Sequence, residues 1–253
     1  MRFTNKSVLV TGGGSGIGRA VCLAFAREGA NIGVADVNRE SAESTVYEVK
    51  KFDRQAVALQ VDVADPESAQ AMVKQTTAAL GGLDVLVNSA GVREIVPFLL
   101  LPFAEWQRII AINLTGTFLC SQAVAQYLVM QGRGGKIVNL ASVAGLTAVP
   151  NRAAYVSSKH AVVGLTKEMA LELAENNIQV NAVAPGVVRT SMTESYFDKP
   201  HVMEGLKKAH PAGRWAQPEE IANLIVFLAS PEADFITGAT FPIDGGFMAG
   251  KGL

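Results

Sequence analysis

The sequence predicts an α/β protein in which one domain is doubly wound around a mostly parallel, seven-stranded sheet with helices on both faces. Short apolar runs alternate with longer segments of helical pattern along the chain, as repeated strand–helix units with right-handed crossovers require. The strand-like runs are apolar almost throughout, which indicates strands buried on both faces. No low-complexity linker or break in composition divides the 253 residues, so we expect a single domain over 1–253.

The elements follow one another in a regular order. Runs rich in β-branched residues predict strands at 7–11, 31–35, 56–61, 84–87, 136–140, 178–182 and 240–243. Apolar residues at helical spacing predict helices at 17–28, 39–51, 66–80, 103–130, 153–174 and 218–229. Only the region around 190–217 carries mixed signals, and we expect it to form a mobile lid over the substrate.

Composition and charge exclude several classes of function. The formal net charge is -1 and no basic cluster is interleaved with aromatic residues, so we expect no nucleic-acid partner. No apolar run approaches about 18 uninterrupted residues, and the first residues lack the apolar segment of a signal peptide. We therefore expect no membrane span and a cytoplasmic location.

The two cysteines predict neither a disulfide nor a metal site. Cys22 and Cys120 lie far apart in apolar helical patterns, which is typical of small core residues. The chain has three histidines and no tight Cys/His cluster, so no metal is expected.

A glycine-rich loop follows the first strand. Residues 11–18 read Thr-Gly-Gly-Gly-Ser-Gly-Ile-Gly, a Thr-Gly-x-x-x-Gly-x-Gly pattern with Gly12, Gly16 and Gly18 in the fixed places. Glycines there allow a tight turn and bring backbone N–H groups close to a pyrophosphate at the start of a helix. The loop predicts a dinucleotide site, although a flexible turn alone would also use glycines.

Asp36 closes the second predicted strand, eighteen residues after Gly18. An acid about 20 residues beyond the glycines can bind the ribose hydroxyls of NAD and would repel the 2′-phosphate of NADP. Arg39 is close enough in sequence to offer that phosphate a positive charge, and Asp36 could be an ordinary turn or cap residue. We expect NAD as the cofactor, with NADP as the weaker alternative.

Tyr155 and Lys159 are four residues apart, and Ser142 lies thirteen residues before Tyr155. Positions i and i+4 face the same way on a helix, with Cβ atoms about 6 Å apart. A cation about 4 Å from a phenol favours the phenolate by about 4 kcal/mol at an effective dielectric constant of roughly 20, or roughly 3 pKa units. The pair predicts a phenol that exchanges protons near pH 7, although a surface helix could carry both residues by chance.

Further motifs make the chain similar to the short-chain dehydrogenase/reductase family, from about Ser7 to Gly246. Asn88-Ser89-Ala90-Gly91 resembles the family's Asn-Asn-Ala-Gly motif, with Ser89 as a departure. Asn113 lies where the family carries a structural and catalytic asparagine. The segment 185–190 resembles the stretch that holds the nicotinamide carboxamide, and 244–246 resembles the C-terminal signature.

The resemblance implies a Rossmann-like fold, a homotetramer and a role for each residue. Tyr155 would exchange a proton with the substrate oxygen, Lys159 would lower the pKa of Tyr155, and Ser142 would hold that oxygen. Asn113 would position a water that links Lys159 to solvent. The residues expected to bind the dinucleotide are Gly12, Ser15, Gly16, Ile17, Gly18, Asp36, Asp62, Val63, Asn88, Ala90, Gly91, Tyr155, Lys159, Pro185, Gly186, Val188 and Thr190.

The expected substrate is a small secondary alcohol or ketone. The segments 92–98, 143–152 and 186–215 should supply a largely apolar pocket with few fixed charges. The alternative is a 3-oxoacyl group on acyl carrier protein, an acidic partner that needs a basic docking face. Known carrier-protein reductases of the family bear an arginine where this chain has Leu171. Near that position Glu168, Glu172 and Glu175 stand against one cation, Lys167, and 122–131 carries none, although Arg133 follows.

A more remote alternative is a dinucleotide-binding protein without catalysis. Such a protein would be free to lose one of the four catalytic positions, because a fold does not by itself fix a function. All four are present, namely Asn113, Ser142, Tyr155 and Lys159.

Overall fold

The structure is a computed structural model that describes residues 1–250. Its strands are β1 Ser7–Thr11, β2 Asn31–Asp36, β3 Ala56–Gln60, β4 Val85–Asn88, β5 Gly135–Leu140, β6 Ile178–Pro185 and β7 Thr240–Ile243. Its helices are α1 Gly16–Arg27, α2 Arg39–Lys50, α3 Pro66–Leu80, α4 Phe103–Ile110, α5 Gly116–Gln131, α6 Ala153–Leu173, α7 Glu194–Phe197, α8 Pro200–Ala209 and α9 Pro218–Leu228.

The strands form one sheet in the order β3-β2-β1-β4-β5-β6-β7. Every neighbouring pair is parallel. The chain winds outward from β1 through β2 to β3, then returns to β4 on the other side of β1 and winds outward again. The predicted seven-stranded, doubly wound sheet is confirmed, and the part of it that the structure describes is entirely parallel.

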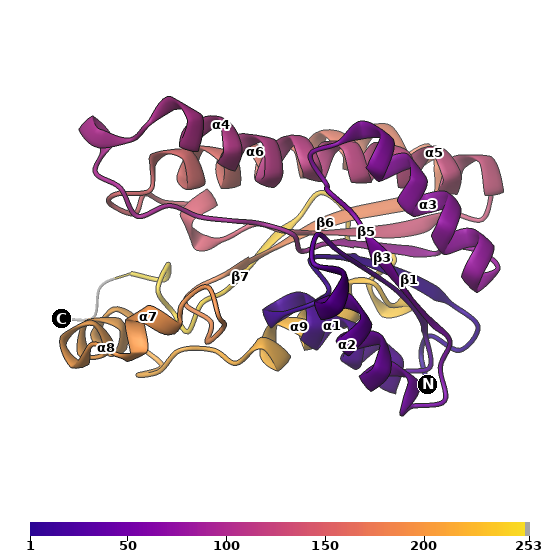
Figure 1. The fold of residues 1–253 in the computed structure, drawn as a ribbon, viewed down its shortest axis with the longest axis horizontal. Helices are drawn as coiled ribbons and strands as arrows, with labels where there is room; N and C mark the ends of the chain where they lie inside the picture. The colour runs from indigo at the N-terminus through magenta and orange to yellow at the C-terminus, as the bar shows by residue number, and fades with distance from the viewer. Residues whose placement is uncertain (251–253) are drawn as a thin grey trace.

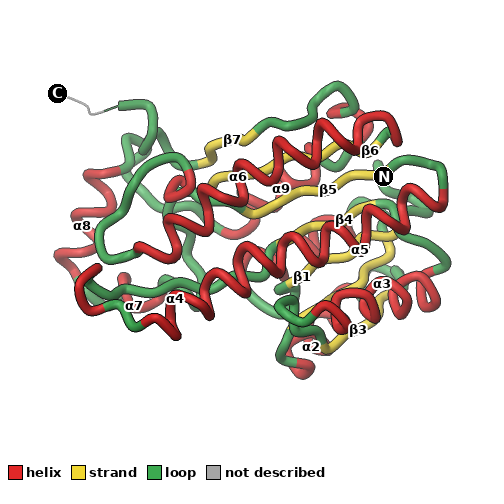
Figure 2. The backbone as a smooth tube through the Cα atoms, turned by 90° about the horizontal axis from the view of Figure 1, so that it is seen from above, coloured by secondary structure: helices red, strands yellow, loops and turns green. Residues whose placement is uncertain are grey.

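Helices cover both faces of this sheet (Figure 1). The helices α3, α4, α5 and α6 lie on one face, and α1, α2 and α9 lie on the other. Helices α7 and α8 lie apart from these layers, beyond one end of the sheet (Figure 2). The predicted mixed segment therefore contains two short helices, and they lie where the carboxyl ends of the strands open.

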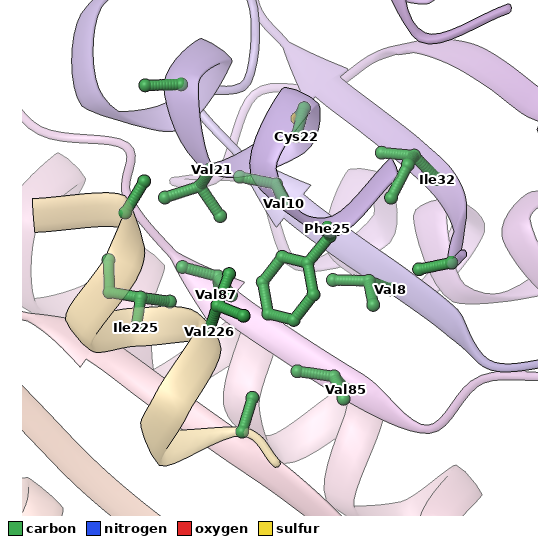
Figure 3. Close-up of a cluster of buried hydrophobic side chains, with 14 of the residues drawn as sticks. Val8, Val10, Val21, Cys22, Phe25, Ile32, Val85, Val87, Ile225 and Val226 are labelled. Carbon is green, nitrogen blue, oxygen red and sulfur yellow. The ribbon is translucent and has the colours of Figure 1, made fainter. Parts of the chain in front are cut away.

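The core beneath α1 and α9 shows why these segments are helical (Figure 3). Val21, Cys22 and Phe25 recur at helical spacing on α1 and are fully buried. They pack with Ile225 and Val226 of α9 and with valines of β1 and β4. Burying a Val, Ile or Phe side chain contributes about 1.5–3 kcal/mol, so this layer holds α1 against the sheet. Cys22 packs close beneath Gly13 of the glycine loop.

The second core layer lies on the opposite face and contains Cys120. Both cysteines are buried free thiols, as predicted. Burial raises the pKa of both, that of Cys120 to about 12, which removes them from thiolate chemistry near neutral pH.

The predicted helix 103–130 is α4 and α5 joined by a π-helical turn at Ala111–Thr115. π turns often mark functional sites, and this one contains Asn113. By length and composition the stretch Phe103–Gln131 could cross a membrane, but half of its most apolar window is buried inside the fold. Because α5 packs on α3 and β4 there, the stretch is weak evidence for a membrane span.

Several strand ends differ from the prediction, and the differences in β4 and β6 follow from pairing between strands. β6 continues to Pro185 rather than ending at 182, since Ala182 through Pro185 pair with β7. β4 begins at Val85 and includes Asn88, which lies between Thr11 and Asn139 on its neighbours. Both extensions carry the strands further toward the end of the sheet where the site forms.

Candidate active site

A cleft with a volume of about 740 Å³ opens at the carboxyl ends of the strands. In a doubly wound sheet, ligands bind there, at the point where the strand order reverses. The predicted residues that line the cleft are Gly12, Ser15, Gly16, Ile17, Gly18, Asp36, Asp62, Val63, Ala90, Gly91, Ser142, Tyr155, Lys159, Pro185, Gly186, Val188 and Thr190. Of the predicted site residues, Asn88 and Asn113 are the two that do not line it.

The glycine loop has the close approaches that its sequence predicts. A Cβ atom on Gly12 would lie 2.8 Å from the backbone nitrogen of Ala90, and one on Gly18 would lie 2.1 Å from the carbonyl oxygen of Gly12. Gly12 also has a φ of 64°, in the region that favours glycine. Because α1 begins at Gly16, its first N–H groups face the cleft. The loop therefore fits a pyrophosphate.

Asp36 is held at the edge of the cleft by two backbone amides. Its Oδ2 accepts from the N–H of Gly14 at 2.9 Å, and its Oδ1 accepts from that of Asn38 at 3.0 Å. Arg39, the cation that could have served a 2′-phosphate, donates instead to Glu43 at 2.8 Å on the exposed side of α2. The cleft wall beside Asp36 consists of Val37, Val61, Asp62 and Val63, so it is apolar and acidic.

Asn88 supports the cleft from beneath and does not line it. Its side chain is 3% exposed. Nδ2 donates to Ser121 Oγ at 2.8 Å and to Asn139 Oδ1 at 2.9 Å. These bonds hold Asn88 beneath the cleft wall, and its predicted contact with the dinucleotide stays a prediction. The segment after β4 is held instead by Thr11, whose Oγ1 accepts from the N–H groups of Ser89 and Ala90 at 3.2 and 3.3 Å.

Ser142, Tyr155 and Lys159 meet on one wall of the cleft. Ser142 follows β5, and its Oγ accepts from the N–H of Ala144 at 3.1 Å, which fixes the turn. Lys159 is only 4% exposed. Its Nζ donates to the carbonyl oxygen of Leu140 at 2.6 Å and lies 5.8 Å from the ring centre of Tyr155.

Burial controls the pKa values of this group. It lowers the pKa of Lys159 from 10.5 to about 8, because a buried ammonium loses its hydration. It also raises the pKa of Tyr155, while the Ser142 hydroxyl and then Arg152 and Arg93 lower it. The sequence predicted that Lys159 would lower the pKa of Tyr155. In the structure the net effect is the opposite, because burial raises the pKa of Tyr155. Helical spacing predicts how close Tyr155 and Lys159 lie to each other. It does not predict how much hydration each group loses in the fold, and that loss shifts the pKa values.

Glu94 fixes the start of α6, the helix that carries Tyr155 and Lys159. Its Oε1 accepts from the N–H of Ala154 at 2.7 Å, and both carboxylate oxygens accept from the N–H of Tyr155 at 3.2 Å. An acid at a helix N-terminus is stabilised by the helix dipole and the free N–H groups. The sequence carried no signal for this contact, because Glu94 lies in a loop far from α6 along the chain.

Asn113 joins the loop after β4 to helix α6. Its Oδ1 accepts from the N–H of Val92 at 2.8 Å, and its Nδ2 donates to the carbonyl of Val92 at 2.8 Å and to Ser158 Oγ at 3.1 Å. A Cβ on Gly91 would lie 3.4 Å from Asn113 Oδ1 and 3.7 Å from Lys159 Nζ. Asn113 thus lies near Lys159 as a fully buried positioning residue, and its predicted contact with a water stays a prediction.

Two arginines, Arg93 and Arg152, line the cleft, which corrects the prediction of few fixed charges in the pocket. Arg93 follows β4 and Arg152 precedes α6. A guanidinium nitrogen of each donates to the hydroxyl of Tyr196 on α7. Arg93 also donates to the carbonyl of Met192. Each arginine lies in a loop, so no periodic pattern in the sequence marked either one.

Comparison with known proteins decides the family. Residues 12–248 match the family model described as Enoyl-(Acyl carrier protein) reductase. The chain belongs to the short-chain dehydrogenase/reductase family. It is 42% identical to the 2,5-dichloro-2,5-cyclohexadiene-1,4-diol dehydrogenase of Sphingobium indicum, covering 98% of both chains. It is 39% identical to the 3-oxoacyl-[acyl-carrier-protein] reductase FabG of Thermotoga maritima, covering 98% of this chain and all (100%) of the other.

Solved structures of this family give the same fold. The crystal structure of levodione reductase superposes with a TM-score of 0.94 at 35% identity, covering 98% of this chain and 99% of the other. This short-chain dehydrogenase/reductase is therefore an enzyme of the class that acts on CH–OH and C=O groups with a nicotinamide cofactor.

Proposed function

We propose that this short-chain dehydrogenase/reductase transfers a hydride between NAD(H) and a secondary alcohol or ketone. The observation that carries the proposal is a single cleft with the glycine loop at one end and Ser142, Tyr155 and Lys159 at the other. A dinucleotide whose pyrophosphate binds at the loop could extend through this cleft to the phenol of Tyr155.

Each residue of the chain has a defined task in that reaction. The bound nicotinamide supplies or accepts the hydride. Ser142 holds the substrate oxygen by a hydrogen bond as negative charge develops on it. In ketone reduction Tyr155 donates its proton to this oxygen, and in alcohol oxidation the phenolate accepts it. Lys159, whose Nζ lies 5.8 Å from the Tyr155 ring centre, would offset part of the cost of burying the phenolate when it forms.

The preference for NAD over NADP rests on charge at the far end of the cleft. Asp36 places a carboxylate at the rim, and Arg39 is engaged by Glu43 on the outside of α2. A 2′-phosphate at this place would face an acid with no neutralising cation in the adjoining wall. The ribose hydroxyls of NAD would instead donate to that acid.

The first experiment tests the proton donor. Purified protein is assayed at 340 nm with a panel of secondary alcohols and ketones and with each cofactor in turn. Tyr155→Phe should lower kcat by at least about 100-fold, the lower range for acid–base catalysis, yet retain NAD binding in calorimetric titration. Tyr47→Phe, an exposed phenol on α2, is the matched control. A Tyr155→Phe protein with normal kcat would remove the phenol from this role.

The second experiment tests cofactor choice. Asp36→Ala should lower kcat/KM for NAD and raise it for NADP, because the variant loses both the ribose acceptor and the repulsion of the phosphate. Glu40→Ala removes a nearby exposed acid that does not line the cleft, and it should leave the ratio alone. An unchanged NAD/NADP ratio in Asp36→Ala would refute the assignment.

Reduction of a 3-oxoacyl group on acyl carrier protein is the second candidate, favoured by the likeness to a protein of that name. The exposed end of α6 argues against it. Leu171 is 78% exposed, and near it the exposed acids Glu168, Glu172 and Glu175 outnumber the exposed Lys167. An acidic carrier would meet like charge there. Faster turnover of 3-oxoacyl carrier protein than of any small ketone would reverse the ranking.

We also propose, by family likeness, that the protein is a cytoplasmic homotetramer. The exposed apolar residues Phe103, Phe118 and Met130 on α4 and α5 support association of subunits through this face. Light scattering coupled to size exclusion tests the assembly, and a mass of 26.7 kDa would indicate a monomer.

A further inference from the structure

We propose that Arg93 and Arg152 form an anion-binding subsite, so that the substrate is an alcohol or ketone bearing a carboxylate or a similar oxyanion. This inference rests on the proposed function and names the substrate class. It narrows the secondary alcohol or ketone that the sequence favoured to one that carries a negative charge.

The two guanidinium groups converge on one point in the cleft. They come from different elements, the loop after β4 and the start of α6, yet both donate to the single hydroxyl oxygen of Tyr196. The Cζ of Arg93 lies 4.5 Å from the ring centre of Tyr196, and that of Arg152 lies 5.9 Å from it. A neutral phenol oxygen thus occupies a place where two cations meet, and a carboxylate would suit that place better.

The charge of these arginines is not neutralised by the protein. Among residues 1–250, neither Arg93 nor Arg152 has a carboxylate within 4.0 Å, whereas Arg2, Arg39, Arg108, Arg189 and Arg214 each pair with a glutamate. Four other described arginines also lack such a partner, but they do not line the cleft as Arg93 and Arg152 do. Glu94 is adjacent in sequence, but its carboxylate accepts from the backbone at the start of α6. Arg152 reaches only the backbone carbonyl of Glu94, at 3.0 Å.

Charge is also divided along the cleft. The acids that line it, Asp36 and Asp62, lie at the ends of β2 and β3, on the nucleotide side. The cations that line it are Arg93, Arg152 and Lys159. Tyr155 lines the same cleft as these cations. An anion at the subsite would therefore bind in the cleft that also holds the proposed proton donor.

A competing explanation is that the two arginines serve only to hold the segment that contains α7 in place. Through Tyr196 and the carbonyl of Met192 they connect the body of the protein to the segment that contains α7. If this were their whole function, removing the Tyr196 hydroxyl would have the same effect as removing an arginine. The two explanations therefore differ in what Tyr196→Phe should do.

The test uses substrates that differ only in charge. The probes are 4-oxopentanoate, 5-oxohexanoate and 6-oxoheptanoate, each compared with its own neutral amide, and the readout is the acid/amide ratio of kcat/KM. For the best chain length we expect a ratio of about 10 or more in the wild type, as a charge-assisted bidentate contact provides. Arg93→Gln and Arg152→Gln should each lower the ratio about tenfold, and Arg152→Lys should lower it less.

Two matched variants complete the design. Tyr196→Phe should keep the ratio at least as high as in the wild type, because both guanidiniums remain. Arg133→Gln removes an exposed arginine remote from the cleft and should leave the ratio unchanged. An acid/amide ratio near 1 in the wild type would overturn the proposal. So would a loss of the ratio in Tyr196→Phe equal to that in the arginine variants.

Calorimetry separates this inference from the proposed function. The same acids and amides are titrated into protein saturated with NAD. If an acid binds and its amide does not, and this binding is lost in Arg93→Gln and Arg152→Gln, the result supports the subsite. It does so even if no ketone is turned over. Absence of turnover would refute only the proposed function. Turnover of neutral ketones with no preferential binding of any acid would refute the subsite and leave the proposed function intact.

Discussion

Lys159→Met should make the free protein more stable near neutral pH while abolishing turnover. The ammonium is 4% exposed, and burial lowers its pKa from 10.5 to about 8. At 1.36 kcal/mol per pKa unit, this difference corresponds to a cost of about 3 kcal/mol for holding the cation in the fold. Methionine has a similar volume and no charge, so the variant avoids that cost.

Part of this gain in stability is offset by the loss of a hydrogen bond. The carbonyl of Leu140 accepts from Lys159 Nζ at 2.6 Å and loses that donor in the variant. A lost hydrogen bond of this kind costs about 1 kcal/mol. The net gain at pH 7 should therefore be about 2 kcal/mol, which for a protein of this size raises Tm by about 4–8 °C.

The pH dependence provides the sharper test. Below pH 8 the lysine is charged in both the folded and the unfolded protein, so its full cost is present. Between pH 8 and 10.5 the unfolded protein holds a proton that the folded protein has released, so the wild type gains stability relative to Lys159→Met as the pH rises. By pH 9.5 the advantage of the variant should have fallen by about 2 kcal/mol.

Urea unfolding without nucleotide, at pH 7 and pH 9.5 and at one protein concentration, measures this difference. Lys74→Met is the control, since Lys74 is exposed on α3 and its substitution should give the same difference in stability at both pH values. A Lys159→Met difference that stays constant within about 0.5 kcal/mol would refute the reasoning, because mutational effects of that size are within ordinary scatter.

Two further predictions concern the frame of the site. Gly18→Ala should lower stability by about 1–3 kcal/mol, as overpacking does, and abolish NAD binding, because its Cβ would lie 2.1 Å from the carbonyl oxygen of Gly12. Gly205→Ala in α8, with nothing within 4 Å of its Cβ, is the control, and normal NAD titration by Gly18→Ala would contradict the prediction. Glu94→Gln should lower stability by about 1 kcal/mol, since it removes the charge at the start of α6. Equal urea midpoints for Glu94→Gln and wild type would show that this charge does not matter.

Features encoded by neighbouring residues could be predicted from the sequence. The alternation of apolar runs and helical patterns was enough for the doubly wound sheet, because each strand and helix shows its own burial pattern. The glycine loop was equally local, since Gly12 and Gly18 belong to one turn whose atoms nearly touch. The spacing of Tyr155 and Lys159 brought both onto one wall of the cleft for the same reason.

The sequence by itself therefore determined the fold class, the loop that suits a dinucleotide and the pairing of a phenol with an ammonium. Only the tertiary structure decided that Glu94 holds the start of α6, that Asn88 lies beneath the cleft wall, and that Arg93 and Arg152 meet at Tyr196. These contacts join loops that are distant along the chain, so no periodicity records them. The structure also reversed the expected direction of the Tyr155 pKa, because burial depends on everything packed around a group and not on its sequence neighbours.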